Sequence, residues 1–449
     1  MWDEETILRV RHQNEEELKG KNLPAILSRM RSNVYQGGPL RCVPELIQNA
    51  QDEGADYVIF VMERDAILSY NNGKPFQDFQ AEDICCIAHS HKSDAQIGWM
   101  GLGFKSVFTV SDHPQVTSGR YNFVFEDLIL PQPAQALPES EWLPPFTPEN
   151  GARFLLPLKG SDSKARNEIL REWKSLTPNL LLFLPGIRKV DFVDGVSNRR
   201  WTFEQHTLPG GMVELTRTDQ RGSSKWMIFK RALEGVAEEV GHKRHVPAVE
   251  IAFPVDETHD CSVEPLYCYL PTGTPTGLHF LVHGDFGLTI SREALLDDEF
   301  NRGMLREAGR LAADAVHELS GTDTLGDRCL WFVPDEGEIL DRRARSLEAS
   351  MLRHLAQKPF LRTDSGARVK ARQAAFADDA VKKLVSQSDL RRISSPHETE
   401  GQASASAKLS RNCCSLRWII LRMVEDIRRC YPETCPDGYS LTGVVFAEL

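Results

Sequence analysis

A carboxylate, a carboxamide and a second carboxylate recur at helical spacing early in the chain, as Glu45, Asn49 and Asp52. If residues 44–52 form a helix, the i, i+4, i+7 spacing places these three side chains on one face. The apolar side chains of the stretch fall on the opposite side: Val43, Leu46, Ile47 and Ala50. A line of such oxygen atoms can hold a water molecule, a divalent metal and a polar ligand. The alternative is a half-buried helix with a solvated polar stripe.

A glycine-rich stretch follows, in which three glycines precede a lysine and a serine: Gly98, Gly101, Gly103, Lys105 and Ser106. Glycines at this spacing let backbone N–H groups approach a polyphosphate, and a helix that begins within the stretch would direct its positive end there. Lys105 would add charge and Ser106 a hydroxyl donor. No G-K-[ST] closes the stretch, so it is not a Walker loop, and its spacing is not that of a dinucleotide fingerprint. The alternatives are simple turn glycines and an exposed helix lysine at position 105.

The order of the motifs resembles a known nucleotide-binding fold. The E-x-x-x-N-x-x-D helix comes first, then a strand and a turn with Asn71, Asn72 and Gly73, and then the glycine stretch. This order is similar to the Bergerat fold of gyrase B, the ninety-kilodalton heat-shock chaperones, histidine kinases and mismatch-repair ATPases. The segments ELIQNAQDEGAD and IGWMGLGFKSVFTVSD resemble still more closely the chaperone-like domains of sacsin and No Vein. The resemblance spans residues 22–160 of this chain.

The resemblance implies ATP as the ligand and Mg²⁺ as its cofactor. Glu45 matches the general base that activates the attacking water, and Asn49 matches the Mg²⁺ ligand. Asp52 would face the same pocket. The glycine stretch, with Lys105 and Ser106 beside it, matches the phosphate loop at the hinge of a lid. Closure of that lid would couple the nucleotide state to the arrangement of the domains.

Two positions depart from the pattern of these families. Asn71, two residues before Gly73, stands where an aspartate reads adenine, although its amide oxygen can still accept from the adenine amino group. Ala152 stands where the chaperones carry a threonine that donates to the ligand, so one hydrogen bond worth about 1 kcal/mol is missing. We therefore expect modest ATP affinity. A scaffold that senses ATP with negligible hydrolysis remains an alternative.

A second region supplies one more candidate residue. The segment GLTISREALL at 287–296 resembles the middle-domain loop of the chaperones, whose arginine reaches the γ-phosphate. Arg292 would then stabilise the charge of the transition state, as an arginine finger does. The alternative is the first turn of a helix that Ser291 caps, with Arg292 on the surface.

The elements around these motifs predict an α+β chain. Residues 1–185 are expected to form a Bergerat-type α/β sandwich, a mixed sheet backed by helices, and residues 186–320 a second α/β domain like the chaperone middle domain. Residues 321–393 are expected to be a mixed, partly helical region. Residues 394–410, rich in Ser, Ala, Gly and Glu, predict a flexible linker, and residues 411–449 an amphipathic helix and tail.

Shorter patterns predict the elements of the first two domains. Residues 57–61 and 66–70 are typical of paired strands, and residues 80–87 of a helix. Further strand patterns occur at 121–125, 153–158, 188–192, 212–215, 225–230, 248–253 and 279–282. After the loop at 284–293, a helix is expected through about Leu319.

Composition limits the class of protein. The chain has 449 residues, of which 41% are hydrophobic and 26% charged, as in ordinary globular proteins. The net charge of −11 argues against a general nucleic-acid binder. No apolar run reaches membrane-spanning length, the first residues are acidic rather than signal-like, and the ten cysteines form no disulfide framework.

We therefore expect an intracellular protein, cytoplasmic or nuclear, with neither a membrane nor a nucleic acid as partner. Protein clients or a partner protein are implied by the resemblance alone. Proteins of the sacsin type are usually much larger, and the chain ends in a strand pattern at 444–446. A truncated member of a larger sacsin-like protein is thus a further alternative.

Overall fold

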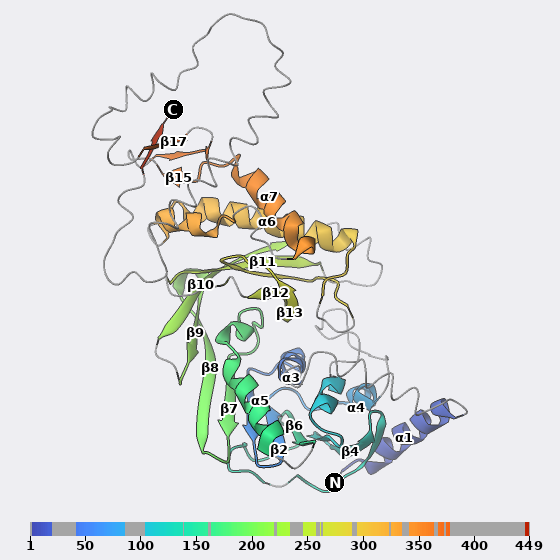
Figure 1. Cartoon of the computed structure of the whole chain (residues 1–449). Coiled ribbons are helices and arrows are strands. Elements are labelled where there is room, and N and C mark those ends of the chain that lie inside the picture. Colours follow the sequence, from blue (N-terminus) through green and yellow to red (C-terminus); the bar gives the residue numbers. More distant parts are fainter. Residues whose placement is uncertain are drawn as a thin grey trace, which may run out of the picture.

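The computed structural model describes residues 2–19, 42–85, 104–137, 139–159, 163–219, 222–233, 246–256, 261, 264–289, 294–322, 325–334, 341–362, 367–371, 374–377 and 445–448. Figure 1 shows a large twisted sheet with helices packed against it. The described helices are α1 (Glu4–Leu18), α3 (Cys42–Asp52), α4 (Asp78–Cys85), α5 (Ser163–Ser175), α6 (Glu299–Leu319) and α7 (Arg345–Leu355). Short 3₁₀ turns are η2 (Phe104–Thr109), η3 (Pro178–Leu181), η4 (Pro209–Gly211), η5 (Gly326–Phe332) and η6 (Arg342–Ala344).

Fourteen strands form one sheet, in the order β13-β12-β14-β11-β10-β9-β8-β7-β1-β2-β6-β3-β4-β5. Their bounds are β1 (Tyr57–Met62), β2 (Ala66–Asn71), β3 (Gln115–Ser118), β4 (Tyr121–Asp127), β5 (Leu130–Pro133), β6 (Ala152–Pro157), β7 (Lys189–Asp194), β8 (Arg199–Thr207), β9 (Met212–Arg217), β10 (Ser223–Ala232), β11 (Ala248–Pro254), β12 (Pro265–Cys268), β13 (Leu270–Pro275) and β14 (Leu281–Gly284). The pairs β1–β7 and β12–β14 are parallel, whereas β1–β2 and β2–β6 are antiparallel. The predicted fold class, an α+β chain with a mixed sheet backed by helices, is confirmed.

The centre of the sheet joins the first two predicted domains. The hairpin predicted at 57–61 and 66–70 is present as β1 and β2, with Val61 opposite Leu68. Beside it, β7 runs parallel to β1 over its whole length, from Tyr57 opposite Lys189 to Met62 opposite Asp194. A continuous sheet therefore crosses the domain boundary that the sequence predicts between residues 185 and 186.

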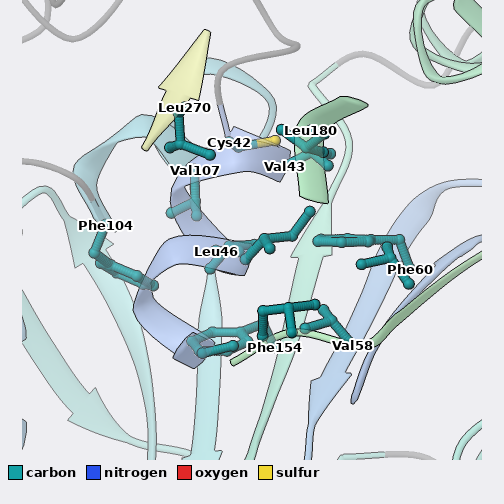
Figure 2. Packing of buried hydrophobic residues seen from close by; sticks show 14 of the residues in the cluster. Cys42, Val43, Leu46, Val58, Phe60, Phe104, Val107, Phe154, Leu180 and Leu270 are labelled. Carbon is teal, nitrogen blue, oxygen red and sulfur yellow. The ribbon is translucent and has the colours of Figure 1, made fainter. Parts of the chain in front are cut away.

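Two hydrophobic cores lie against this sheet. The first contains the apolar side of α3, together with η2, α5 and the strands β1, β6 and β7. Figure 2 shows Leu46 of α3 within this core, among Phe104, Val107 and Phe154. The second core is formed by α6 and α7 packed over β10, β11 and β14 (Figure 1). The strands β12 and β13 lie between α3 and the α6 layer.

Several elements were not predicted from the sequence, among them α5, β3, β5, β8, β12 and β13. The helix expected through Leu319 is α6, whose first turn is capped by Asp298 through the Asn301 N–H. Two small sheets follow, β15 (Leu361–Arg362) with β16 (Arg368–Val369), and β17 (Ala374–Ala377) with β18 (Val445–Glu448). The predicted linker at 394–410, and the part of the predicted helix and tail from 411 to 444, lie outside the described residues.

Two chemical features of the described residues bear on the sequence predictions. None of the helices among them is long and apolar enough to cross a membrane. The cysteines of this part of the chain are buried thiols, and burial raises the pKa of the Cys42 thiol to about 12. A thiol with so high a pKa is a poor nucleophile at neutral pH.

Candidate functional site

The helix α3 presents the predicted stripe of polar side chains. Its apolar side is buried in the first core, where Val43, Leu46 and Ile47 are at most 2% exposed. On the other side Glu45 is only 3% exposed, whereas Asn49 and Asp52 are half-buried. The helix and its two faces are therefore as predicted, but the stripe is not solvated along its whole length.

The turn after β2 is packed onto the carboxyl end of α3. The Lys74 N–H donates to the Glu53 carbonyl oxygen over 2.9 Å. A Cβ atom at Gly73 would lie 3.1 Å from both Cβ and the carbonyl oxygen of Glu53. A side chain at position 73 would push Glu53 and the turn apart by a few tenths of an ångström, so glycine permits this close approach. The structure thus brings the Asn71–Gly73 turn to the end of the polar stripe.

Asn71 lies at the end of β2 between two strands. It stands opposite Val58 of β1 and Ala152 of β6, and its side chain is 7% exposed. Its amide oxygen accepts from the Gly73 N–H over 3.1 Å. Gly151 has a φ of +63°, and a Cβ atom there would lie 1.7 Å from the Asn71 carbonyl oxygen. Glycine at 151 therefore lets Ala152, the second departure from the family pattern, pair directly with Asn71.

Asn72, by contrast, has a structural role. Its amide oxygen accepts from the N–H groups of Asp56 and Tyr57, over 3.1 Å and 3.0 Å. Its amide nitrogen donates to the Asp56 carboxylate over 2.7 Å. These bonds fix the start of β1 against the turn. Of the two neighbouring asparagines, only Asn71 belongs to the candidate site.

Lys105 is buried, which excludes one of the two alternatives that the sequence left open. It is 0% exposed, so it is not an exposed helix lysine. Its Nζ donates to the carbonyl oxygens of Ile84 and Leu128, over 2.7 Å and 2.5 Å, and lies 4.8 Å from the centre of the Phe125 ring. In this structure the ammonium group is engaged by backbone carbonyls, at the carboxyl end of α4, where a cation is favoured. A contact between Lys105 and phosphate stays a prediction.

Asn14 of α1 completes the arrangement around Lys105. Its amide nitrogen donates to the carbonyl oxygens of Cys85 and Ile129, over 3.1 Å and 2.7 Å. These two residues directly follow the acceptors of Lys105, Ile84 and Leu128. One amide and one ammonium group thus join the end of α4 to the β4–β5 turn.

Ser106 and Gln48 are buried polar residues on neighbouring elements, η2 and α3. The Ser106 hydroxyl is in a side chain that is 3% exposed, and it has no hydrogen-bond partner in the described part of the chain. Neither amide atom of Gln48, which is 1% exposed, has a partner there either. Gln48 lies one helical turn from Glu45. Gln48 is not among the predicted site residues, although its i, i+3 spacing to Glu45 and i, i+4 spacing to Asp52 place it on the same stripe.

The remaining predicted residues are not described. Gly98, Gly101, Gly103 and Arg292 lie outside the described residues. The flanks of residues 290–293 are described: Thr289 N–H donates to the Ala294 carbonyl over 2.9 Å, and Leu288 forms a bridge with Leu295. A helix was expected to begin within the glycine stretch, and the described residues after it, Phe104–Thr109, form the 3₁₀ helix η2.

Comparison with known proteins finds a family and a relative to which the chain is similar. The Sacsin domain family matches residues 25–132. The protein NO VEIN of Arabidopsis thaliana is 28% identical over 335 residues, an alignment that covers 66% of this chain and 12% of that protein. The chain thus spans about an eighth of the length of this curated relative. The resemblance to sacsin and No Vein is confirmed.

A solved structure is also similar. The B-subunit of the DNA gyrase from Myxococcus xanthus is 15% identical, with a TM-score of 0.42, and the match covers 68% of this chain and 98% of that chain.

Proposed function

We propose that this chain binds ATP together with Mg²⁺ along the polar stripe of α3, and that it hydrolyses ATP to ADP and phosphate. The observation that carries the proposal is the packing of the Asn71–Gly73 turn onto Glu53, at the carboxyl end of the helix that carries Glu45, Asn49 and Asp52. The match of residues 25–132 to the Sacsin domain supports it independently.

Each residue of the stripe has a chemical role in this proposal. Glu45 is the general base, since a carboxylate can take a proton from the water that attacks the γ-phosphorus. Asn49 offers an amide oxygen, a hard ligand that suits Mg²⁺. When bound, Mg²⁺ neutralises charge on the phosphates. The half-buried Asn49 and Asp52 fit such a role, because their oxygen atoms lie on one face of a rigid helix.

The base of the nucleotide is assigned to the Asn71 end of the stripe. The Asn71 amide oxygen has two lone pairs, of which the Gly73 N–H uses one. The other can accept from the adenine amino group. The opposing residue, Ala152, has only a methyl group, so it adds no donor. We infer modest affinity from this pairing.

Arg292 is proposed to stabilise the transition-state charge, and this part of the proposal rests on the sequence of residues 287–296. Protein clients or a protein partner are inferred in the same way. The role of Arg292 needs an experiment of its own. We expect the turnover rate of Arg292→Ala at saturating ATP to fall below that of the wild type, without loss of ATP affinity.

The test measures binding and hydrolysis separately. Titration calorimetry with ATP, in the presence and absence of Mg²⁺, measures binding by the full chain. Single-turnover phosphate release then compares the wild type with Glu45→Gln, which keeps the size of the side chain but not its basicity. We expect Glu45→Gln to bind ATP normally and to release phosphate at least about a hundredfold more slowly.

Glu348→Gln is a matched control, because Glu348 is also a buried glutamate, at 6% exposure, on an eleven-residue helix, α7. It should release phosphate at the wild-type rate. Equal release by wild type and Glu45→Gln, with normal binding, would support the second candidate, an ATP-sensing scaffold. The methyl group of Ala152 opposite Asn71 favours that candidate. Absence of binding would refute both.

A further inference from the structure

Tyr269 has an unusual backbone conformation. It is the single residue between β12 and β13, where Cys268 pairs with Leu270, and its φ is +61°. Left-handed backbone is costly for a bulky side chain, so glycine or asparagine is the usual choice in such a turn. A residue of this kind persists only where its surroundings hold it, and such residues cluster at functional sites.

Contacts on one side hold Tyr269 to the end of β14. Its hydroxyl donates to Oδ1 of Asp285 over 2.7 Å, and its ring meets the His283 ring edge-on, with centres 4.7 Å apart. Asp285 is itself fixed: its Oδ2 accepts from the Ala248 N–H over 2.8 Å, and its own N–H donates to the Ala248 carbonyl oxygen. The Tyr269 side chain is thus anchored to the residue that begins segment 285–289.

The residue after Tyr269, Leu270, packs in the first hydrophobic core. Leu270 is 5% exposed and belongs to the same hydrophobic cluster as Cys42 and Val43. In Figure 2 it lies beside the first turn of α3, the turn that precedes Glu45. Because Tyr269 and Leu270 are adjacent in the chain, we expect a shift of that turn that displaces Leu270 to reach the Tyr269 anchor.

His283 stiffens the anchor. Its ring is 4% exposed and lies between Tyr269 and Phe183, with the Phe183 ring centre 4.9 Å away. Burial lowers the pKa of His283 to about 4, so the imidazole is neutral at physiological pH. A neutral ring between two aromatic rings keeps its packing as the pH changes around neutrality.

We propose that Tyr269 and Asp285 are a positioning pair, which couples the first turn of α3 to segment 285–289. The coupling runs from the first turn of α3 through Leu270, a member of the same core cluster, to the strained Tyr269 and its hydrogen bond with Asp285. As a role in ATP turnover it rests on the proposed function, because segment 285–289 leads to the loop assigned to Arg292. As a mechanical link it can be tested without nucleotide.

The experiment is a double-mutant cycle read by hydrogen exchange on the full chain. Val43→Ala perturbs the first turn of α3, and the readout is amide exchange in peptides that cover residues 281–289. The cycle is run in three backgrounds: wild type, Tyr269→Phe and Tyr267→Phe. Tyr267 is the matched control, since its buried hydroxyl also donates over 2.7 Å, but to Glu264.

We expect Val43→Ala to speed exchange at 281–289 by at least about threefold in the wild type and in Tyr267→Phe. In Tyr269→Phe the same change should have no further effect, because the hydrogen bond to Asp285 is already gone. An equal effect in all three backgrounds, or none in any, overturns the proposal. If Tyr269→Phe fails to fold, Tyr269→Asn replaces it, because asparagine tolerates the left-handed backbone.

A second arm adds Mg²⁺ and ATP. Binding should slow exchange at residues 42–52 in both tyrosine variants and slow it at 281–289 only where Tyr269 is present. If the wild type binds no ATP, the proposed function fails, whereas the nucleotide-free cycle still decides the coupling. If ATP protects 281–289 equally in Tyr269→Phe, the pair has no role in positioning this segment.

Discussion

Two buried carboxamides, one in each half of the molecule, differ in what surrounds them. Asn301 of α6 is 2% exposed, and its side chain makes three hydrogen bonds: it accepts from Gly287 N–H and donates to the carbonyl oxygens of Gly287 and Leu296, over 2.7–2.8 Å. Gln48 of α3 is 1% exposed and has no partner among the described residues. The same chemical group is thus satisfied in one region and unsatisfied in the other.

The difference separates a structural site from a candidate ligand site. A buried amide without hydrogen bonds is unfavourable, and folded proteins seldom keep one without a water molecule or ligand beside it. Asn301 joins Gly287 to Leu296, the two ends of the segment that follows Asp285, so its hydrogen bonds stabilise the fold. Gln48 lies one helical turn from Glu45, where the proposed function places a ligand and its water. The comparison therefore predicts opposite effects for the loss of each amide.

The largest effect is expected for Asn301→Leu. Three partly buried hydrogen bonds to the backbone of Gly287 and Leu296 are lost, which should lower the free energy of unfolding by about 4 kcal/mol. Urea unfolding, monitored by circular dichroism, measures the loss. Asn301→Asp keeps the acceptor for Gly287 N–H and should lose less. A loss below about 1 kcal/mol would mean that Asn301 is not the brace described here.

A smaller loss, about 3 kcal/mol, is expected for Lys105→Met, because the carbonyl oxygens of Ile84 and Leu128 lose a buried cation. Lys159→Met is the control: this lysine also donates to a carbonyl oxygen, that of Phe108, but its side chain is 28% exposed. Calorimetry on the folded fraction then decides the predicted phosphate contact: an unchanged ATP affinity of Lys105→Met would assign this lysine to the fold alone. A large loss of ATP affinity with little loss of stability would mean that Lys105 binds the phosphates. Lys105 would then belong, like Gln48, to the proposed ligand site rather than to the structural groups of the fold.

The smallest effect, and the only gain, is expected for Gln48→Leu. Replacing an unsatisfied buried amide by an apolar group of similar size should raise the free energy of unfolding by about 1 kcal/mol. Differential scanning fluorimetry should show a higher Tm without ligand and a smaller rise on adding ATP. Gln51→Leu is the control, because Gln51 of the same helix already accepts from Gly186 N–H and should show no gain. Destabilisation by Gln48→Leu would contradict the contrast with Asn301.

The sequence predicted the local elements of the site well. The helix of Glu45, Asn49 and Asp52, the β1–β2 hairpin and the turn at Asn71–Gly73 are all present. Each depends on residues close together in the chain, through helical spacing, apolar runs or turn residues. The resemblance to sacsin and No Vein rests on the same segments, and it is confirmed by the match over residues 25–132.

What the sequence could not predict depends on residues far apart. The acceptors of Lys105 lie 21 and 23 positions away, so its sequence neighbours gave no sign of its burial. The parallel pairing of β7 with β1 and the turn at Tyr269 likewise depend on packing between distant segments.

The sequence by itself therefore determined which side chains α3 presents and which known proteins the chain resembles, because periodicity and motifs are local. Only the tertiary structure decided which buried polar groups are satisfied. A hydrogen bond needs a partner at about 3 Å, and for Asn301, Lys105 and Gln48 the fold alone determines whether one is there.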